Sequence, residues 1–265
     1  MPPSRKRARR YDLVRTRTAV QAQFAHVRSA VGTLTPEQLA LPTRLGAWTV
    51  RELAVHLTTA VSHVTRNLEL PEPSGGPGLA LDQWPFSTAG RADRIAADTE
   101  ALAAERPDLG ALYAEVAGRF EELVPGVGED RLLPTRVGVM RLGDFLVTRT
   151  VELVVHTDDL NAATGLDIPY DRQALAACTR LLADALAARA PGGSVEVRIP
   201  PFAVVQCVEG PRHTRGTPPN VVETDPLTWV RLATGRTRWS AALDAAQVGA
   251  SGERADLGDL LPLLG

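Results

Sequence analysis

Cysteine is scarce in this chain of 265 residues, which contains only Cys178 and Cys207. Two cysteines are too few for a disulfide framework and too few for a zinc site built from thiolates. We interpret both as small apolar residues of a buried core. This scarcity excludes the class of small proteins that are stapled by disulfides.

An excess of either charge is also missing. The formal net charge is −2, so no basic field points to nucleic acid or to a membrane surface. Lys6 is the only lysine, which together with the frequent alanine indicates a high-GC genome. No apolar run approaches the length of a membrane span, and no segment has the layout of a signal peptide. We therefore expect a cytoplasmic protein without a nucleic-acid or membrane partner. We also expect it to be monomeric or homodimeric.

Apolar periodicity predicts a helical domain after a short tail. Residues 1–10 are rich in proline and arginine, and we expect a disordered basic tail there. Residues 11–190 carry helical patterns, which predict an all-α bundle of four to six helices. We place these helices at 11–31, 49–68, 88–105, 109–124, 144–164 and 171–190, with loops at 33–48, 71–86 and 125–138.

The composition changes at Pro191-Gly192-Gly193-Ser194, and residues 191–265 predict a small α+β domain. The predicted fold class is therefore a two-domain arrangement, a helical bundle followed by an α/β unit. Residues 210–219 are rich in glycine, proline, arginine and threonine and predict a loop. The expected strands are 195–199, 202–208, 221–223 and a pair within 241–248, and the expected helices are 227–233 and 255–264.

One long predicted helix carries a candidate pair of metal ligands. Neither glycine nor proline interrupts residues 144–164. Glu152 and His156 are four residues apart, which places them one turn apart on the same face. With Phe145 and Arg149 they fall within an arc of roughly 60° beside the apolar face. A carboxylate and an imidazole at a buried face are costly unless they are paired or bind something, so the pair predicts a third ligand elsewhere.

The helix that begins after Thr49 supplies that third ligand. Thr49 and Glu52 have the spacing of a capping box. His56 lies at the margin of the apolar face of this helix, and His63 lies further toward solvent. Either residue is a candidate, and His56 is the better placed.

Two interpretations of these side chains remain open. His56, Glu152 and His156 suit Zn²⁺ and would leave coordination positions free, with Arg149 or Asp159 orienting a ligand. The alternative is a buried network of hydrogen bonds and ion pairs without a metal.

Two segments resemble signatures of the mycothiol-dependent maleylpyruvate isomerase family, which belongs to the DinB-like metal-binding four-helix bundles. Residues 45–57 contain Trp48-Thr49-Val50 and end in His56-Leu57, as in W-T-V-x-(D/E)-x-x-x-H-L. Residues 149–160 resemble R-x-x-E-x-x-x-H-x-x-D-L. The resemblance covers roughly the first 165 residues and is more specific than one short motif. It implies a DinB-like bundle with His56, Glu152 and His156 as the metal ligands.

The C-terminal part resembles a second known unit. It is similar to the small sterol-carrier-type domain that many members of the family carry. Residues 195–236 also resemble actinobacterial proteins of the sterol carrier family. This resemblance implies a fold rather than an activity.

The resemblance also implies a chemistry. The metal, most simply Zn²⁺, would bind the thiol of mycothiol and lower its pKa. The thiolate would add to a small electrophilic substrate, as an isomerase or as an S-transferase. An arginine would hold a substrate carboxylate, and the candidates are Arg149, Arg212, Arg215 and Arg236. The segments 200–202 and 210–216 differ from the isomerase pattern, so the resemblance leaves the substrate open.

A carrier without enzymatic activity is the competing function. In that case the C-terminal domain would bind an apolar ligand, and the helical bundle would be a scaffold with a structural or vestigial metal site. A continuous apolar tunnel among Phe202, Val204, Trp229 and Trp239 would support this function, and a filled core there would count against it.

Overall fold

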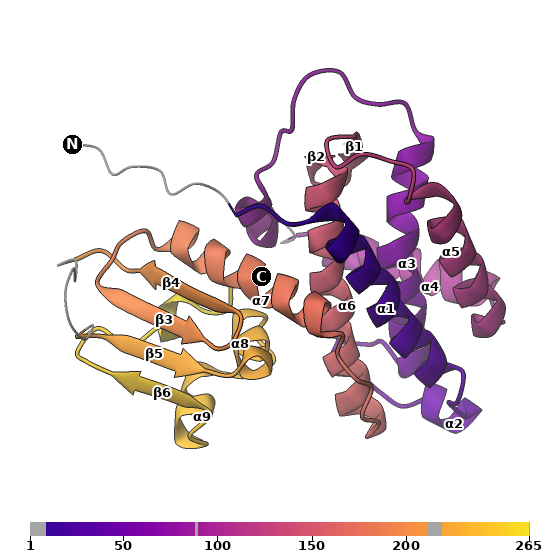
Figure 1. Ribbon diagram of the computed structural model, residues 1–265. Coiled ribbons are helices and arrows are strands. Elements are labelled where there is room, and N and C mark those ends of the chain that lie inside the picture. Colours follow the sequence, from indigo (N-terminus) through magenta and orange to yellow (C-terminus); the bar gives the residue numbers. More distant parts are fainter. Residues whose placement is uncertain (1–8, 88–89, 211–218, 265) are drawn as a thin grey trace.

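The computed structural model describes residues 9–87, 90–210 and 219–264. Figure 1 shows a helical half and a half built on a small sheet, with α7 between them. Most of the predicted tail lies outside the described residues, whereas Arg9 forms a bidentate ion pair with Asp184. The helical half contains α1 (Leu13–Val31), α2 (Pro36–Leu39), α3 (Val50–Glu69), the 3₁₀ turn η1 (Leu81–Ser87), α4 (Ala92–Glu105), α5 (Leu109–Leu123), β1 (Leu132–Thr135), β2 (Gly138–Arg141), α6 (Leu142–Thr164) and α7 (Arg172–Arg189).

The long helix α6 is the centre of the helical half. It packs against α1, α3 and α7, so nearly every side chain from Leu142 to Leu160 is buried. Its threonines remain compatible with a buried helix because their hydroxyls donate to carbonyls within the helix, as Thr157 does to Leu153. The helix ends at Gly165, whose φ of 73° is left-handed. The predicted uninterrupted helix is therefore confirmed.

The C-terminal half is a four-stranded sheet in the order β4-β3-β5-β6, flanked by helices. Its strands and helices are β3 (Val195–Ile199), β4 (Ala203–Cys207), β5 (Val221–Thr224), α8 (Pro226–Ala233), α9 (Trp239–Asp244), β6 (Val248–Ser251) and the 3₁₀ turn η2 (Gly258–Leu260). The β3–β4 and β5–β6 pairs are antiparallel, and β3–β5 is parallel. Helix α7 packs on β4 and α8 as well as on α6, which joins the two halves. The predicted two-part fold class, helical and then α+β, is confirmed.

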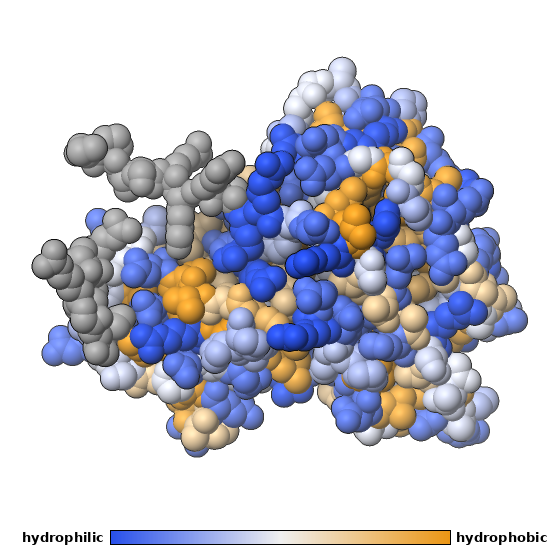
Figure 2. All heavy atoms as spheres, in the orientation of Figure 1, coloured by the Kyte–Doolittle hydropathy of each residue, from blue (hydrophilic) through white to orange (hydrophobic). Residues whose placement is uncertain are grey.

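The buried cores of the two halves are continuous, since one apolar cluster extends from Ala19 to Leu263. Cys178 and Cys207 belong to it as free, buried thiols, as predicted. Figure 2 shows hydrophilic side chains across the junction of the two halves and separate small apolar patches on that face. No helix within the described residues is long and apolar enough to cross a membrane.

Several local predictions are wrong. Residues 125–138 were expected to be a loop, but β1 and β2 form a hairpin there that pairs Leu132 with Arg141. Pro134 within β1 conceals the strand, because proline is unfavourable in a strand pattern. A short capped helix, α2, occupies part of the predicted loop 33–48, and the predicted helix 88–105 begins only at Ala92, with residues 88–89 outside the described part.

Two predictions near the C-terminus are also wrong. The expected strand pair within 241–248 is a helix, α9, followed by a single strand, β6. The expected helix 255–264 contains only the turn η2. The amides of Leu263 and Leu264 donate to the carbonyl of Ala233 at the end of α8, and Pro262 has no amide hydrogen. Contacts with α8 therefore replace the hydrogen bonds that a terminal helix would make.

Candidate metal centre

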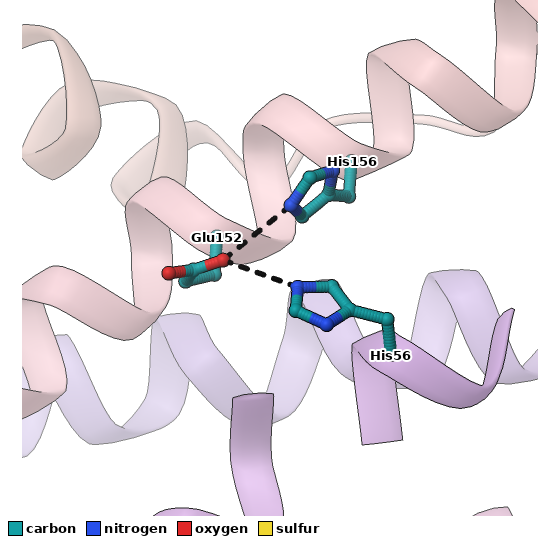
Figure 3. Close-up of side chains that lie close together, drawn as sticks. All are labelled: His56, Glu152 and His156. Carbon is teal, nitrogen blue, oxygen red and sulfur yellow. Dashed lines mark ion pairs between the residues drawn. The ribbon is translucent and has the colours of Figure 1, made fainter. Parts of the chain in front are cut away.

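His56 of α3 and the pair Glu152 and His156 of α6 converge on one point. Figure 3 shows both imidazole rings turning a nitrogen toward the same carboxylate oxygen of Glu152. The Nε2 atoms of His56 and His156 lie 3.5 and 3.4 Å from Oε2 of Glu152. The two rings stand perpendicular, with their centroids 4.8 Å apart. The structure thus brings together the three residues that the sequence selected.

Local structure fixes the direction of each side chain. The capping box at the start of α3 is present, with the amide of Thr49 donating to the Glu52 carboxylate at 2.9 Å. His56 follows almost two turns later and is 8% exposed. On α6 the i,i+4 spacing aligns Glu152 and His156, as expected for a helix.

The donor set and its spacing fit a divalent metal. The three ligand atoms lie within 4.8 Å of one another. Bonds of about 2.0–2.1 Å would place two ligands of a tetrahedral zinc ion roughly 3.4 Å apart, close to the two nitrogen–oxygen separations here. At these separations the nitrogens are at or beyond the usual limit of a hydrogen bond to Glu152. The residues present are therefore suited to holding such an ion.

The two histidines differ in their second nitrogen. Nδ1 of His156 lies 2.8 Å from Oδ2 of Asp159, and the buried carboxylate only accepts, so this nitrogen carries the proton. Nε2 of His156 is then free to act as a ligand. Nδ1 of His56 is buried and has no hydrogen-bond partner among the described residues. The ring of His56 packs instead against Trp48, with the centroids 5.0 Å apart.

The pKa values of the histidines shift in opposite directions. Burial lowers the pKa of His56, and Glu152 opposes this only in part. Burial would also lower the pKa of His156, but its hydrogen bond to Asp159 and the nearby carboxylates of Asp159 and Glu152 outweigh burial and raise this pKa. Burial would raise the pKa of Glu152, but the neighbouring nitrogens of His156 and His56 and the charge of Arg149 prevail and hold it well below the usual value. Glu152 is therefore ionised.

A cavity of about 130 Å³ adjoins this cluster. His56, Glu152 and the buried side chain of Arg149 contribute to its wall, together with His63 and Trp84. The Arg149 guanidinium lies 4.4 Å from the centroid of the Phe145 ring. Its ion pair with Glu152 is long, at 3.8 Å, and its hydrogen bonds go to uncharged oxygens of Thr148 and Ala60. Arg149 thus presents a buried positive charge to the cavity.

The other candidates have different positions. His63 lines the cavity outside the three-residue cluster, and burial above all lowers its pKa to about 3. Arg215 lies outside the described residues, as do Arg212 and His213. Arg236 is bound to Asp159 rather than open to a substrate. Arg44 and Arg231 form ion pairs with Asp158 and were not predicted. Nothing in the sequence around either arginine indicates an ion pair with α6.

The four residues expected to line a tunnel do not share one environment. Trp229 is 1% exposed within the continuous core, whereas the side chain of Val204 is 58% exposed. The arrangement of these residues therefore lends no support to an apolar carrier.

Comparisons with known proteins agree with the geometry. Residues 20–161 match the family described as mycothiol maleylpyruvate isomerase N-terminal domain, and residues 171–263 match the family described as bacterial SCP ortholog. The second match includes α7, whereas composition suggested a boundary after residue 190. No curated protein matches the chain in sequence.

Two solved structures resemble this chain over most of its length. One is a mycothiol-dependent maleylpyruvate isomerase, with 16% sequence identity, a TM-score of 0.58, and coverage of 93% of this chain and 95% of the other. The second is a histidine-to-alanine mutant of a protein with the same name, with 16% identity, a TM-score of 0.57 and the same coverage. At this identity the likeness establishes the fold. The family match over residues 20–161, by contrast, includes more than half of the chain. The chain therefore belongs to the mycothiol maleylpyruvate isomerase N-terminal domain family, with a bacterial SCP-type domain at its C-terminal end.

Proposed function

We propose that the protein is a metal-dependent isomerase or S-transferase that uses mycothiol and acts on a small electrophile. The observation that carries this proposal is the convergence of His56, Glu152 and His156 beside a cavity that also contains Arg149. Family membership supports mycothiol as the thiol. We place the activity in the cytoplasm, where small thiols are kept reduced.

His56, Glu152 and His156 would hold the metal, for which this donor set favours Zn²⁺. When bound, such an ion lowers the pKa of a coordinating thiol, so that a thiolate is available near neutral pH. Glu152 is ionised, and in the neutral form of His156 the proton on Nδ1 leaves Nε2 unprotonated. The protein therefore presents a carboxylate and at least one free imidazole nitrogen without further rearrangement.

Arg149 would bind the substrate. A buried guanidinium without a close counter-ion is costly, and a carboxylate or a developing negative charge in the cavity would offset that cost. Trp84 and Phe145 shield Arg149 from water, which strengthens such a pairing. His63 stays neutral near pH 7 because its pKa is about 3, so it can contribute a hydrogen bond but no charge. These features favour an electrophile that carries a carboxylate.

The test is turnover with purified protein, mycothiol and Zn²⁺, using maleylpyruvate as the isomerase probe and a bimane electrophile as the transferase probe. We expect activity with one of them. Arg149→Gln should lower kcat/KM for a carboxylate-bearing substrate by about 10- to 150-fold, because a charge-assisted pair of about 1.5–3 kcal/mol is lost. The variant should retain its metal. Metal-free wild-type protein after incubation with Zn²⁺ would refute the proposal.

The amount of thiol distinguishes the two reaction classes. In an isomerisation the thiolate adds to the conjugated double bond and leaves again, so mycothiol is unchanged after many turnovers. In an S-transfer one mycothiol is consumed for each product formed. Titration of the remaining thiol against product therefore decides between them.

A further inference from the structure

Two consecutive carboxylates on α6 connect the metal centre to the C-terminal half. Asp158 and Asp159 are 2% and 0% exposed. Three arginines from other parts of the chain bind them: Arg44 from the segment before α3, Arg231 from α8 and Arg236 from the segment after α8. Two buried carboxylates side by side would repel each other strongly, and the three guanidinium groups offset their charge.

The two carboxylates have separate roles in this network. Asp158 accepts from Arg231 at 2.6 and 3.0 Å and from the hydroxyl of Tyr170 at 3.2 Å. Asp159 accepts from Arg236 at 2.9 and 3.2 Å. Arg44 reaches both carboxylates, at 2.5 Å each. Of the two, Asp159 is the one that also contacts the candidate ligand His156.

One oxygen of Asp159 contacts both the candidate ligand His156 and the C-terminal half. Oδ2 of Asp159 lies 2.8 Å from Nδ1 of His156 and 2.9 Å from Nη2 of Arg236. Arg236 is held in turn, because its Nη1 donates to the carbonyl of Thr234 at 2.8 Å. Its side chain is only 16% exposed. Arg236 from the C-terminal half and Arg44, which donates to Oδ1, therefore fix the rotation of the Asp159 carboxylate together, and Arg236 is the one that shares Oδ2 with His156.

We propose that Arg236 is a positioning residue through which the C-terminal half orients the metal ligand His156 by way of Asp159. The proposal rests on the metal site proposed above. A carboxylate that accepts the Nδ1 proton sets both the ring orientation and the tautomer, and loss of such a partner typically weakens metal binding by about 10- to 100-fold. Arg236 extends this support by one residue, across the boundary between the halves.

The test measures Zn²⁺ affinity of the full chain at pH 7.5 by competition with a chromophoric chelator, together with the Tm of the metal-free protein. Arg236→Ala should weaken Zn²⁺ binding by about 10-fold or more. Arg231→Ala is the matched control, because it removes an ion pair between the same halves that ends on Asp158. It should lower the Tm yet keep the Zn²⁺ affinity within about threefold of wild type. Arg236→Gln, which retains a donor, should fall between them and replaces Arg236→Ala if that variant does not fold.

A second measurement follows the hydrogen bond itself. In wild-type protein the Nδ1 proton of His156 should exchange slowly with water in the imidazole NMR spectrum. Arg236→Ala should accelerate this exchange, and Arg231→Ala should not. A merely structural role would affect both variants alike.

The outcomes separate this inference from the proposed function. If wild-type protein binds no Zn²⁺, the metal site fails and the positioning role fails with it. If wild-type protein binds Zn²⁺ and Arg236→Ala binds it as tightly as Arg231→Ala does, the positioning role alone is overturned. A selective loss in the Arg236 variants supports it.

Discussion

The α3 side and the α6 side of the candidate metal centre each present one imidazole but hold it differently. His156 on α6 is fixed by a charged chain of hydrogen bonds that continues through Asp159 to Arg236. His56 on α3 is fixed by packing against Trp48, and its Nδ1 has no partner among the described residues. Hydrogen bonds are directional and packing is not, so we infer that the α6 side defines the site and the α3 side adapts to it.

The largest expected effect comes from replacing one of the two candidate histidine ligands. Loss of a residue that only hydrogen-bonds a metal ligand weakens metal binding by up to roughly 100-fold. His156→Ala or His56→Ala should weaken Zn²⁺ binding by more than this, because each variant lacks a ligand itself. Elemental analysis after dialysis checks this. His63→Ala is the control and should retain the metal, since His63 lies outside the cluster. Full zinc content in His156→Ala would contradict the assignment.

Lowering the pH should also release the metal, and the two sides should respond differently. Both imidazoles must be unprotonated to bind, so affinity should fall by about tenfold per pH unit once one proton competes. In metal-free protein the raised pKa of His156 stabilises the fold below pH 6.5, and this is lost as the pH rises through the shifted value. The lowered pKa of His56 has the opposite sign, so its contribution is present above pH 6.5 and is lost as the pH falls through the shifted value.

NMR of the imidazoles in metal-free protein separates these two titrations. At pH 6.5 His156 should be mainly protonated and His56 mainly neutral. If both rings titrate together near pH 6.5, the two sides are equivalent and the comparison is wrong.

A smaller effect is expected from the packing on the α3 side. Trp48→Leu removes the aromatic contact with His56, which is worth about 0.5–1.5 kcal/mol. Zn²⁺ affinity should therefore fall by about 2- to 10-fold, less than in Arg236→Ala. Chelator competition on both variants compares the contribution of aromatic packing with that of the hydrogen bonds. A larger loss of Zn²⁺ affinity in Trp48→Leu than in Arg236→Ala would contradict the expected order.

The smallest effect on the site should come from the start of α3. Thr49→Ala weakens the capping box and should lower the free energy of unfolding by about 1 kcal/mol. His56 lies almost two turns further on, so Zn²⁺ affinity should stay within about twofold. Urea denaturation measures the first quantity and chelator competition the second. A parallel loss of metal would show that the cap also positions His56.

Short-range patterns correctly predicted much of this molecule. The uninterrupted periodicity of residues 144–164 predicted α6 and the shared face of Glu152 and His156. The predicted helix 227–233 is α8, and the Asp225 carboxylate caps its start by accepting from the amides of Leu227 and Thr228. These features depend on residues within one or two turns of each other. The local sequence carries that information directly.

Short and irregular elements were predicted less well. Four-residue strands such as β1 and β2 contain too few residues for alternation to be recognised, and Pro134 argues against a strand. The segment 255–264 has helical periodicity, but contacts of its backbone with α8 determine its conformation. Local preference is a weak influence wherever a distant partner satisfies the backbone.

The candidate metal centre shows the same difference between local and long-range features. Its three candidate ligands follow from helical spacing and from the resemblance to two family signatures, because residue identity and spacing along a helix can be read from neighbouring residues. The arginine partners of Asp158 and Asp159 are Arg44, Arg231 and Arg236, which lie 73 to 115 residues away along the chain. The sequence alone does not distinguish which of the many arginines pairs with a given carboxylate. Which of them reaches α6 depends on how the helices and the sheet pack, because an ion pair requires proximity in space and leaves no periodic trace in the chain.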